Sequence, residues 1–116
     1  MADDFGEAGK NRFYGEDGPI AACATALSNT ALSLIRASGN GCIGLLAASF
    51  SRPAALLAAP GNTVVHGWIV DGGSRIDEVL VSVYRAPKSY TGEDGLDIAC
   101  HGGISAGRAV LAALQR

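Results

Sequence analysis

The sequence predicts an α+β domain in which helices pack against one side of a mixed, largely antiparallel sheet. Three observations predict this class. Apolar segments of strand length follow one another through short turns, segments with helical spacing lie between the groups of strands, and a double glycine at 72–73 marks a hairpin. Strands joined mostly by short turns, with helices between the groups, are typical of α+β domains. A length of 116 residues fits one small domain with one modest core.

The first two predicted strands lie between residues 20 and 36. Residues 20–24 are small and apolar, as in a buried strand, and LSNTA at 27–31 predicts a turn. LSLIR at 32–36 predicts a second strand, antiparallel to the first, whose alternate residues point to opposite faces. One face of this strand would then carry Leu32, Leu34 and Arg36, and the other Ser33 and Ile35.

A helix is predicted after this pair of strands. Ser38 is a residue type that caps helix N-termini, and Arg52-Pro53 ends the segment because proline cannot continue a helix. Residues 54–59 predict one further helical turn. The apolar residues at helical spacing in the predicted helix are Ile43, Leu46 and Phe50.

A β-hairpin is the clearest element of the second half. Residues 63–70 are rich in β-branched side chains, and the glycines of Asp71–Ser74 suit a tight loop. Residues 75–85 form the returning strand, which Pro87 ends because proline cannot donate to a strand ladder. One face of the returning strand would carry Val79, Val81 and Val83.

A short strand and a last helix complete the predicted order β-β-α-β-β-β-α. The strand covers residues 96–100, and Gly102-Gly103 leads from it into the helix. The stripe of this helix that would face the core carries Ile104, Gly107, Leu111 and Leu114.

Composition and charge narrow the classes of function. The net charge is −2 and the basic residues form no patch, so charge does not indicate nucleic-acid binding. Hydrophobic residues make up 48% of the chain, and a short chain this apolar often exposes an apolar face at a subunit interface. The three cysteines include no C-x-x-C pair, which disfavours a disulfide framework or a zinc knuckle and favours a reducing compartment.

The N-terminal residues 1–17 predict a flexible polar tail, because they are rich in glycine and charge. They lack the basic and then apolar pattern of a signal peptide. No apolar run in the chain approaches the roughly 20 residues of a membrane helix. We therefore expect a cytoplasmic protein without a membrane segment.

The stretch SYTGEDGLDIACHGG, residues 89–103, contains the candidate reactive groups. Cys100 and His101 are neighbours on a predicted strand, so their side chains point to opposite faces and do not easily share a metal ion. His66 lies on another strand, so we predict no metal site and no catalytic residue. A small thiol enzyme that uses Cys100 stays an alternative, because a nearby base would activate the thiolate.

Arg36 and Asp97 are the unusual residues of their predicted strands. Asp97 interrupts the apolar segment 96–100, and Arg36 ends the apolar strand 32–36. A carboxylate on a buried strand needs a cationic or hydrogen-bonding partner. One explanation is that the two residues pair with each other, and the other is that both face a pocket and bind a planar, polar ligand. The residues alone favour the pairing and leave both explanations open.

Four motifs carry a resemblance to a known family. They are IRASG at 35–39, IDEVL at 76–80, SYTGED at 89–94 and HGG at 101–103. Together they resemble the N-terminal domains of bacterial tRNA-modifying GTPases of the MnmE or TrmE family, in which S-[YF]-T-G-E-D is followed at short range by H-G-G. The combination is specific, and the resemblance covers nearly everything after the N-terminal tail.

The resemblance implies a domain similar to the tetrahydrofolate-binding domains of one-carbon enzymes. Members of the family bind 5-formyl- or methylene-tetrahydrofolate and form a homodimer through this domain. The whole proteins add a helical domain and a GTPase domain with GTP, Mg²⁺ and K⁺. With an MnmG-type flavoprotein they modify C5 of the wobble uridine of tRNA. The family's folate contacts fall on Arg36 and Asp97, which favours ligand binding over simple pairing.

The chain departs from the family pattern at three places. Asp97 stands where the family commonly has glutamate, and TALSNTA at 25–31 replaces the family's T-P-P-G-R-G-G turn. The sequence stops before the family's segment P-G-E-F-T-x-R-A-F-L-N-G-K, whose lysine is a third folate contact, and before the GTPase motifs. We therefore expect residues 18–116 to be a truncated folate-binding and dimerisation domain. The alternative is a purely structural dimerisation module with a non-functional folate pocket.

Overall fold

The structure is a computed structural model, and it covers most of the predicted domain. The predicted tail at 1–17, the predicted turn at 27–31 and Gly102-Gly103 lie outside the residues that it describes. The described residues are 18–23, 32–101 and 104–114, and among these the side chains of 104–106 are left out.

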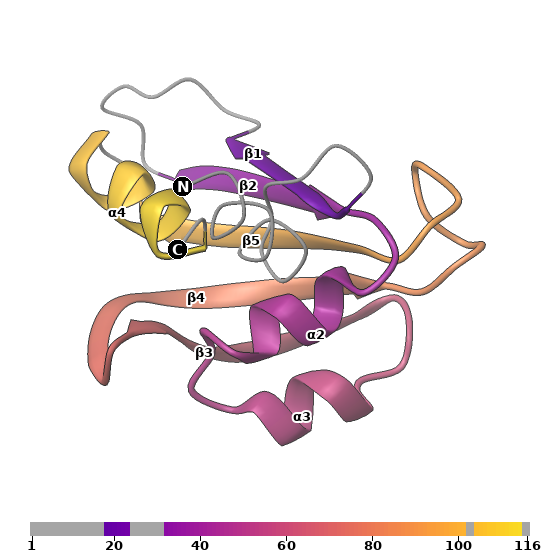
Figure 1. The fold of residues 1–116 in the computed structure, drawn as a ribbon, viewed down its shortest axis with the longest axis horizontal. Helices are drawn as coiled ribbons and strands as arrows, with labels where there is room; N and C mark the ends of the chain where they lie inside the picture. Colours follow the sequence, from indigo (N-terminus) through magenta and orange to yellow (C-terminus); the bar gives the residue numbers. More distant parts are fainter. Residues whose placement is uncertain (1–17, 24–31, 102–103, 115–116) are drawn as a thin grey trace, which may run out of the picture.

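Five strands form one sheet in which every described pair of neighbours is antiparallel (Figure 1). The order across the sheet is β1–β2–β5–β4–β3, so the last strand of the chain lies between β2 and β4. The predicted α+β class is therefore confirmed. The strands are β1 (Ile20–Cys23), β2 (Leu32–Ser38), β3 (Thr63–Asp71), β4 (Ser74–Tyr84) and β5 (Gly95–His101).

Helices α2 and α4 lie on the same side of the sheet, and α3 packs against α2 (Figure 1). The helices are α2 (Cys42–Ala47), α3 (Pro53–Ala58) and α4 (Ile104–Leu114). Helix α3 is the further helical turn that the sequence predicts, and it begins at Pro53 because proline is tolerated in the first turn of a helix. No described helix has the length and apolar character needed to cross a membrane.

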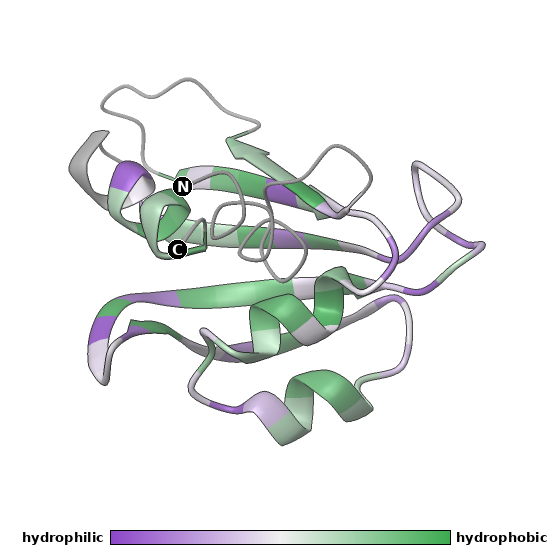
Figure 2. Cartoon of the chain, in the orientation of Figure 1, coloured by the Kyte–Doolittle hydropathy of each residue, from purple (hydrophilic) through white to green (hydrophobic). Residues whose placement is uncertain are grey.

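The core lies between the sheet and helices α2 and α4. Figure 2 shows hydrophobic residues along β4 and on α2. Ile35, Val81 and Ile98, from three adjacent strands, are 0% exposed. Leu46 of α2 and Val110 of α4 belong to the same core cluster on the helical side of the sheet and are also 0% exposed. Full burial of such a side chain stabilises the fold by about 1.5–3 kcal/mol, so this layer fixes the position of β5.

The β3–β4 hairpin turns through two glycines. Gly72 and Gly73 have φ values of 56° and 87°, in the region that residues with a Cβ adopt reluctantly. A two-residue hairpin loop with positive φ at both positions matches the right-handed twist of its strands. The loop is shorter than the predicted Asp71–Ser74, because both flanking residues pair with each other in the ladder.

The predicted helix cap at Ser38 is wrong. Ser38 is the last residue of β2, and its Oγ lies 2.6 Å from Thr91 Oγ1. The strand continues past Arg36 because Ala37 and Ser38 still pair with β5. The N-cap of α2 is Gly41, at φ 87°, and no side chain caps the helix there.

Phe50 does not belong to the first helix either, although its spacing from Leu46 is helical. Helix α2 ends at Ala47, and Phe50 forms an isolated antiparallel bridge with Ile69 of β3. Its ring, which is 3% exposed, packs directly over Gly67. The contact with β3 therefore decides the position of Phe50 against the local helical pattern.

The buried stripe of α4 is shifted from the predicted one. Gly107 and Leu114 are buried as predicted, but Val110 is fully buried and Leu111 only half-buried. Gly107, Val110 and Leu114 are spaced i, i+3 and i+7, which is the standard apolar face of a helix. The side chain of Ile104 lies outside the described residues.

Candidate ligand-binding site

Arg36 and Asp97 lie on the side of the sheet that no described helix covers, which we call the open face. The two residues are direct partners in the β2–β5 register. Their neighbours Ile35 and Ile98 point to the core, so strand alternation places both charged side chains on the open face. This confirms the predicted division of residues 32–36 into two faces, of which the one with Ser33 and Ile35 is buried.

The two side chains form a bidentate ion pair. Arg36 Nε donates to Asp97 Oδ1 at 2.9 Å, and Arg36 Nη2 donates to Asp97 Oδ2 at 3.3 Å. The side chain of Asp97 is 12% exposed and that of Arg36 is 43% exposed. The hydrogen bond to Asp97, and then its charge, raise the pKa of Arg36. The pair is therefore open to solvent on the arginine side.

Two tyrosines complete this cluster, and the sequence reasoning missed both. The hydroxyl of Tyr84, from β4, donates to Asp97 Oδ2 at 3.4 Å, and burial raises the pKa of Tyr84. Arg36 Cζ lies 4.4 Å from the ring centroid of Tyr90, a distance typical of cation–π contacts. The two tyrosine rings meet edge to face, with centroids 6.0 Å apart at 67°. We call these four residues the ion-pair cluster.

The sequence contains a local signal for Tyr84 but not for Tyr90. Tyr84 follows Leu80 and Ser82 on the outward face of a predicted strand, and Ser82 pairs directly with Asp97. Tyr90 lies inside SYTGED, a motif that carries the family resemblance but has no strand alternation that would place its side chain. Alternation along β4 would have indicated Tyr84, but the contact of Tyr90 with Arg36 depends on how the loop folds back over the sheet.

The loop at 86–94, between β4 and β5, is fixed at both ends. Asp94 makes two of the bonds: its carbonyl accepts from Gly39 N–H at 2.9 Å, and its Oδ1 accepts from Ala86 N–H at 2.8 Å. Thr91 Oγ1 lies 2.6 Å from Ser38 Oγ at the end of β2. Gly92 has a φ of 80°, which permits the tight turn. These hydrogen bonds hold Tyr90 beside β2.

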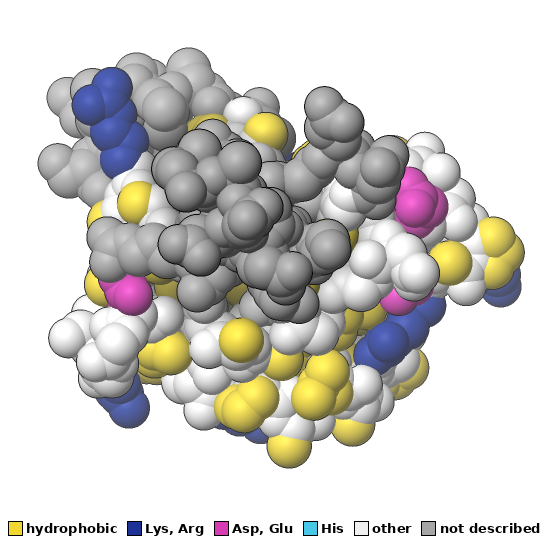
Figure 3. Space-filling view, viewed as in Figure 1, with side chains coloured by type: hydrophobic (Ala, Val, Ile, Leu, Met, Phe, Trp, Pro, Cys, Tyr) yellow, Lys and Arg dark blue, Asp and Glu magenta, His cyan; other side chains and the backbone are white. Residues whose placement is uncertain are grey.

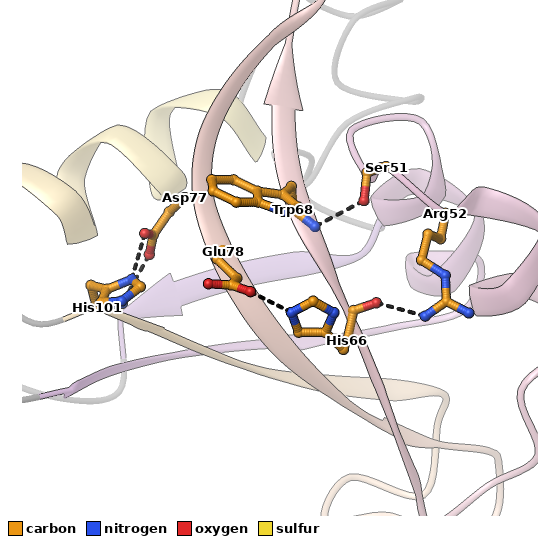
Figure 4. Close-up of polar contacts among 7 residues, drawn as sticks. All are labelled: Ser51, Arg52, His66, Trp68, Asp77, Glu78 and His101. Atoms are coloured by element: carbon orange, nitrogen blue, oxygen red, sulfur yellow. Dashed lines mark hydrogen bonds and ion pairs between the residues drawn. The ribbon is translucent and has the colours of Figure 1, made fainter.

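A second polar cluster lies on the β3–β4 side of the molecule (Figure 4). His66 Nε2 is 2.6 Å from Glu78 Oε2, and His101 Nδ1 is 2.6 Å from Asp77 Oδ1. The carboxylate of Asp77 also accepts from the His101 backbone N–H at 2.8 Å. A half-open pocket of about 310 Å³ lies here, and Leu32, Leu80, Ala99, His66, Glu78 and His101 are among its lining residues.

Cys100 lies on the opposite side of β5 from His101. It is 1% exposed, and its Sγ donates to the Ser33 carbonyl at 3.4 Å. Burial, and then the charge of Asp77, raise the pKa of Cys100 to about 11. A thiol with this pKa is almost entirely protonated at neutral pH, and the residue is almost fully buried. The geometry therefore argues against a thiol enzyme.

The fold and the ion-pair cluster define an antiparallel α+β domain with a polar site on its open sheet face. A family model described as "GTP-binding protein TrmE N-terminus" matches residues 19–116. The chain therefore belongs to the family of TrmE N-terminal domains, as its motifs predict.

Curated relatives support the same assignment. The chain is 53% identical over 94 residues to a tRNA modification GTPase MnmE from Treponema denticola, which covers 79% of this chain and 20% of the relative. It is 50% identical over 97 residues to the protein of that name from Treponema pallidum, covering 84% of this chain and 20% of the relative. The corresponding protein of Borreliella burgdorferi is 42% identical over 96 residues, covering 81% and 21%. The chain thus spans about a fifth of the length of these relatives.

Proposed function

We propose that the chain binds a reduced folate, 5-formyl- or methylene-tetrahydrofolate, at Arg36 and Asp97. We further propose that it forms a homodimer and acts in the cytoplasm as the N-terminal domain of a tRNA modification GTPase that modifies C5 of the wobble uridine. The observation that carries the proposal is the ion pair on the open face. It is paired but not sealed, since 43% of the Arg36 side chain is exposed.

The chemistry of the cluster suits the pterin of a folate. A carboxylate has about four acceptor positions. Among the described residues, Asp97 accepts two hydrogen bonds from Arg36 and a long one from Tyr84. An amino group and a ring N–H can share this carboxylate or replace Arg36 on one of its oxygens. The guanidinium then has donors left for a carbonyl oxygen or an anionic tail. The residues present therefore fit the group.

The whole-protein part of the proposal involves GTP, Mg²⁺, K⁺, tRNA and an MnmG-type flavoprotein. Its support is the printed name of the relatives, which describes tRNA modification GTPases. The proposal assigns no residue of this chain to those ligands or partners. For this chain it assigns the folate contacts and the dimer only.

Isothermal titration of the 116-residue chain with 5-formyl-tetrahydrofolate tests the folate contacts. We expect a Kd in the micromolar range, about −8 kcal/mol. Arg36→Lys keeps the charge but loses the two-pronged donor geometry, so we expect the Kd to rise at least about tenfold. Arg75→Ala is the matched control, because Arg75 also lies over an aromatic ring, that of Trp68 at 4.9 Å. Absence of heat with millimolar folate, in a chain that circular dichroism shows to be folded, would contradict the proposal.

A purely structural dimerisation module is the second candidate function. Two features favour it: Asp97 is already bonded to Arg36, and its carboxylate is one methylene shorter than the family's glutamate. If the chain is only a structural dimerisation module, the Arg36→Lys variant shows no loss of function. Light scattering would report a dimer while the folate titration stayed flat.

A further inference from the structure

Tyr90 is exposed to an unusual degree for an aromatic side chain with a defined position. It is 75% exposed, yet its ring covers the guanidinium of Arg36 at 4.4 Å and meets Tyr84 edge to face. An aromatic ring buries area favourably, and leaving it in water forgoes that gain. One face of the ring is therefore available to a ligand.

Hydrogen bonds hold the chain on both sides of Tyr90. Its neighbour Ser89 donates through Oγ to the Glu93 carbonyl, and Thr91 Oγ1 is bonded to Ser38 of β2. Lys88 N–H donates to the Arg85 carbonyl at 3.0 Å. Because the residues on both sides are held, the ring stays beside Arg36 with little loss of conformational entropy on binding. Preorganisation of this kind favours affinity.

The groups around the ring select a class of ligand. Asp97 accepts from adjacent N–H donors, Arg36 donates to oxygen, and the Tyr90 ring offers a flat π surface. A flat heterocycle with an amino group next to a ring N–H satisfies all three. Pterins have this edge, and so does guanine. Stacking adds selectivity for the flat ring, which the ion pair alone cannot supply.

We infer that Tyr90 is the stacking platform of the site: one face of its ring lies on Arg36, and in the complex the other face lies on the flat pyrimidinone ring of the bound pterin. This inference rests on the proposed folate function and adds a binding residue to it. It also assigns Tyr84 a positioning role, because its hydroxyl holds Asp97 and its ring supports the edge of Tyr90.

Two variants at position 90 separate the effect of ring stacking from the effect of an apolar side chain of some size. Tyr90→Phe keeps the ring and loses only a hydroxyl, so we expect its Kd for 5-formyl-tetrahydrofolate to stay within about twofold of the wild-type value. Tyr90→Leu keeps an apolar side chain without a π surface, and we expect its Kd to rise about tenfold. Isothermal titration of the whole chain measures both. Guanosine monophosphate, titrated in parallel, tests whether a guanine base is the ligand instead.

A ligand-observed NMR measurement provides a readout that a structural role would not change. We expect the pterin C7 protons to shift upfield on binding to the wild type and to Tyr90→Phe, and to shift much less on binding to Tyr90→Leu, because leucine produces no ring current. If Tyr90→Leu binds as tightly as the wild type while Arg36→Lys is impaired, the stacking inference fails and the folate function stands. If the wild type binds guanosine monophosphate but not the folate, the platform stands and the folate function fails. If it binds neither, both fail.

Discussion

Arg36 and Asp97 keep their charges at the sheet surface because each satisfies the other. Asp97 is only 12% exposed on its side chain, and a carboxylate that is buried to this extent needs donors. Arg36 supplies two and Tyr84 a third. The Arg36 side chain is 43% exposed, so the ion pair contributes little net stability and the cost of desolvating its charges is low. A pair of this kind is suited to exchange one partner for a ligand.

The environment of a single residue, Ser33, leads to a prediction about the stability of the fold. Ser33 is 2% exposed, and its Oγ has no hydrogen-bond partner among the described residues. An unsatisfied buried hydroxyl costs about 1–3 kcal/mol. We therefore expect Ser33→Ala to leave the free energy of unfolding unchanged or to raise it by about 1 kcal/mol, measured by urea denaturation.

Ser38→Ala is the control on the same strand, because it removes a hydroxyl that is bonded to Thr91 at 2.6 Å. We expect it to lower the free energy of unfolding by about 1 kcal/mol. A loss at Ser33→Ala as large as that at Ser38→Ala would show that the Ser33 hydroxyl has a partner.

The residues of the site were predictable in part. Arg36 and Asp97 stand out because Asp97 interrupts an apolar strand and Arg36 ends one, and alternation shows which residues within each strand share a face with them. Their direct pairing was one of two open explanations, because it depends on β2 and β5 being neighbours although 61 positions separate them in the chain. Tyr90 was not predictable from local pattern, since its ring meets Arg36 only after the loop at 86–94 folds back.

Among the elements, β3 and the segment after α2 depend on each other. Phe50 fits under β3 only because residue 67 has no side chain: a Cβ there would lie 2.4 Å from Phe50 Cζ. The ring is 3% exposed and belongs to the core cluster. This contact also explains why Phe50 left the predicted helix. Helical spacing is a weak local preference, and the bridge to Ile69 together with burial of the ring outweighs it.

We expect Gly67→Ala to lower the free energy of unfolding by about 1–3 kcal/mol, the usual cost of overpacking a core. Gly44→Ala is the matched control, because a Cβ at Gly44 meets nothing within 4 Å and alanine favours the helix. Urea denaturation of both variants measures the difference. Equal stability of the two variants would mean that Phe50 does not pack on Gly67 in solution.

On the scale of the whole molecule, the two sides of the sheet differ in what covers them. Helices α2 and α4 bury one side, whereas the open face exposes apolar side chains of β2, β3 and β4: Leu32 is 64% exposed, Val64 60% and Leu80 49%. Hydrophobic side chains also reach the surface over α3 on the helical side (Figure 3). Grouped exposed apolar residues often mark a subunit interface. We propose that these apolar side chains of the open face, beside the ion-pair cluster, form the surface of the homodimer.

Leu80→Glu tests this surface, because a charge at the centre of an apolar interface loses its hydration without gaining a partner. We expect this variant to be monomeric at concentrations where the wild type is dimeric. Static light scattering measures the molar mass of both. Leu57→Glu is the control, since Leu57 is 53% exposed on α3, on the helical side. A wild-type chain that is monomeric at high concentration would refute the dimer, and a dimer that tolerates Leu80→Glu would refute this face.

We propose that Arg36 and Asp97 bind a reduced folate from the open face of the sheet. The most direct test is a titration of the isotope-labelled chain with 5-formyl-tetrahydrofolate, followed by backbone amide NMR. Folate binding at this site predicts saturable shifts that are largest for β2 and β5 around these two residues and for the loop that carries Tyr90. Shifts confined to helices α2 and α4, or no shifts at millimolar ligand, would contradict it.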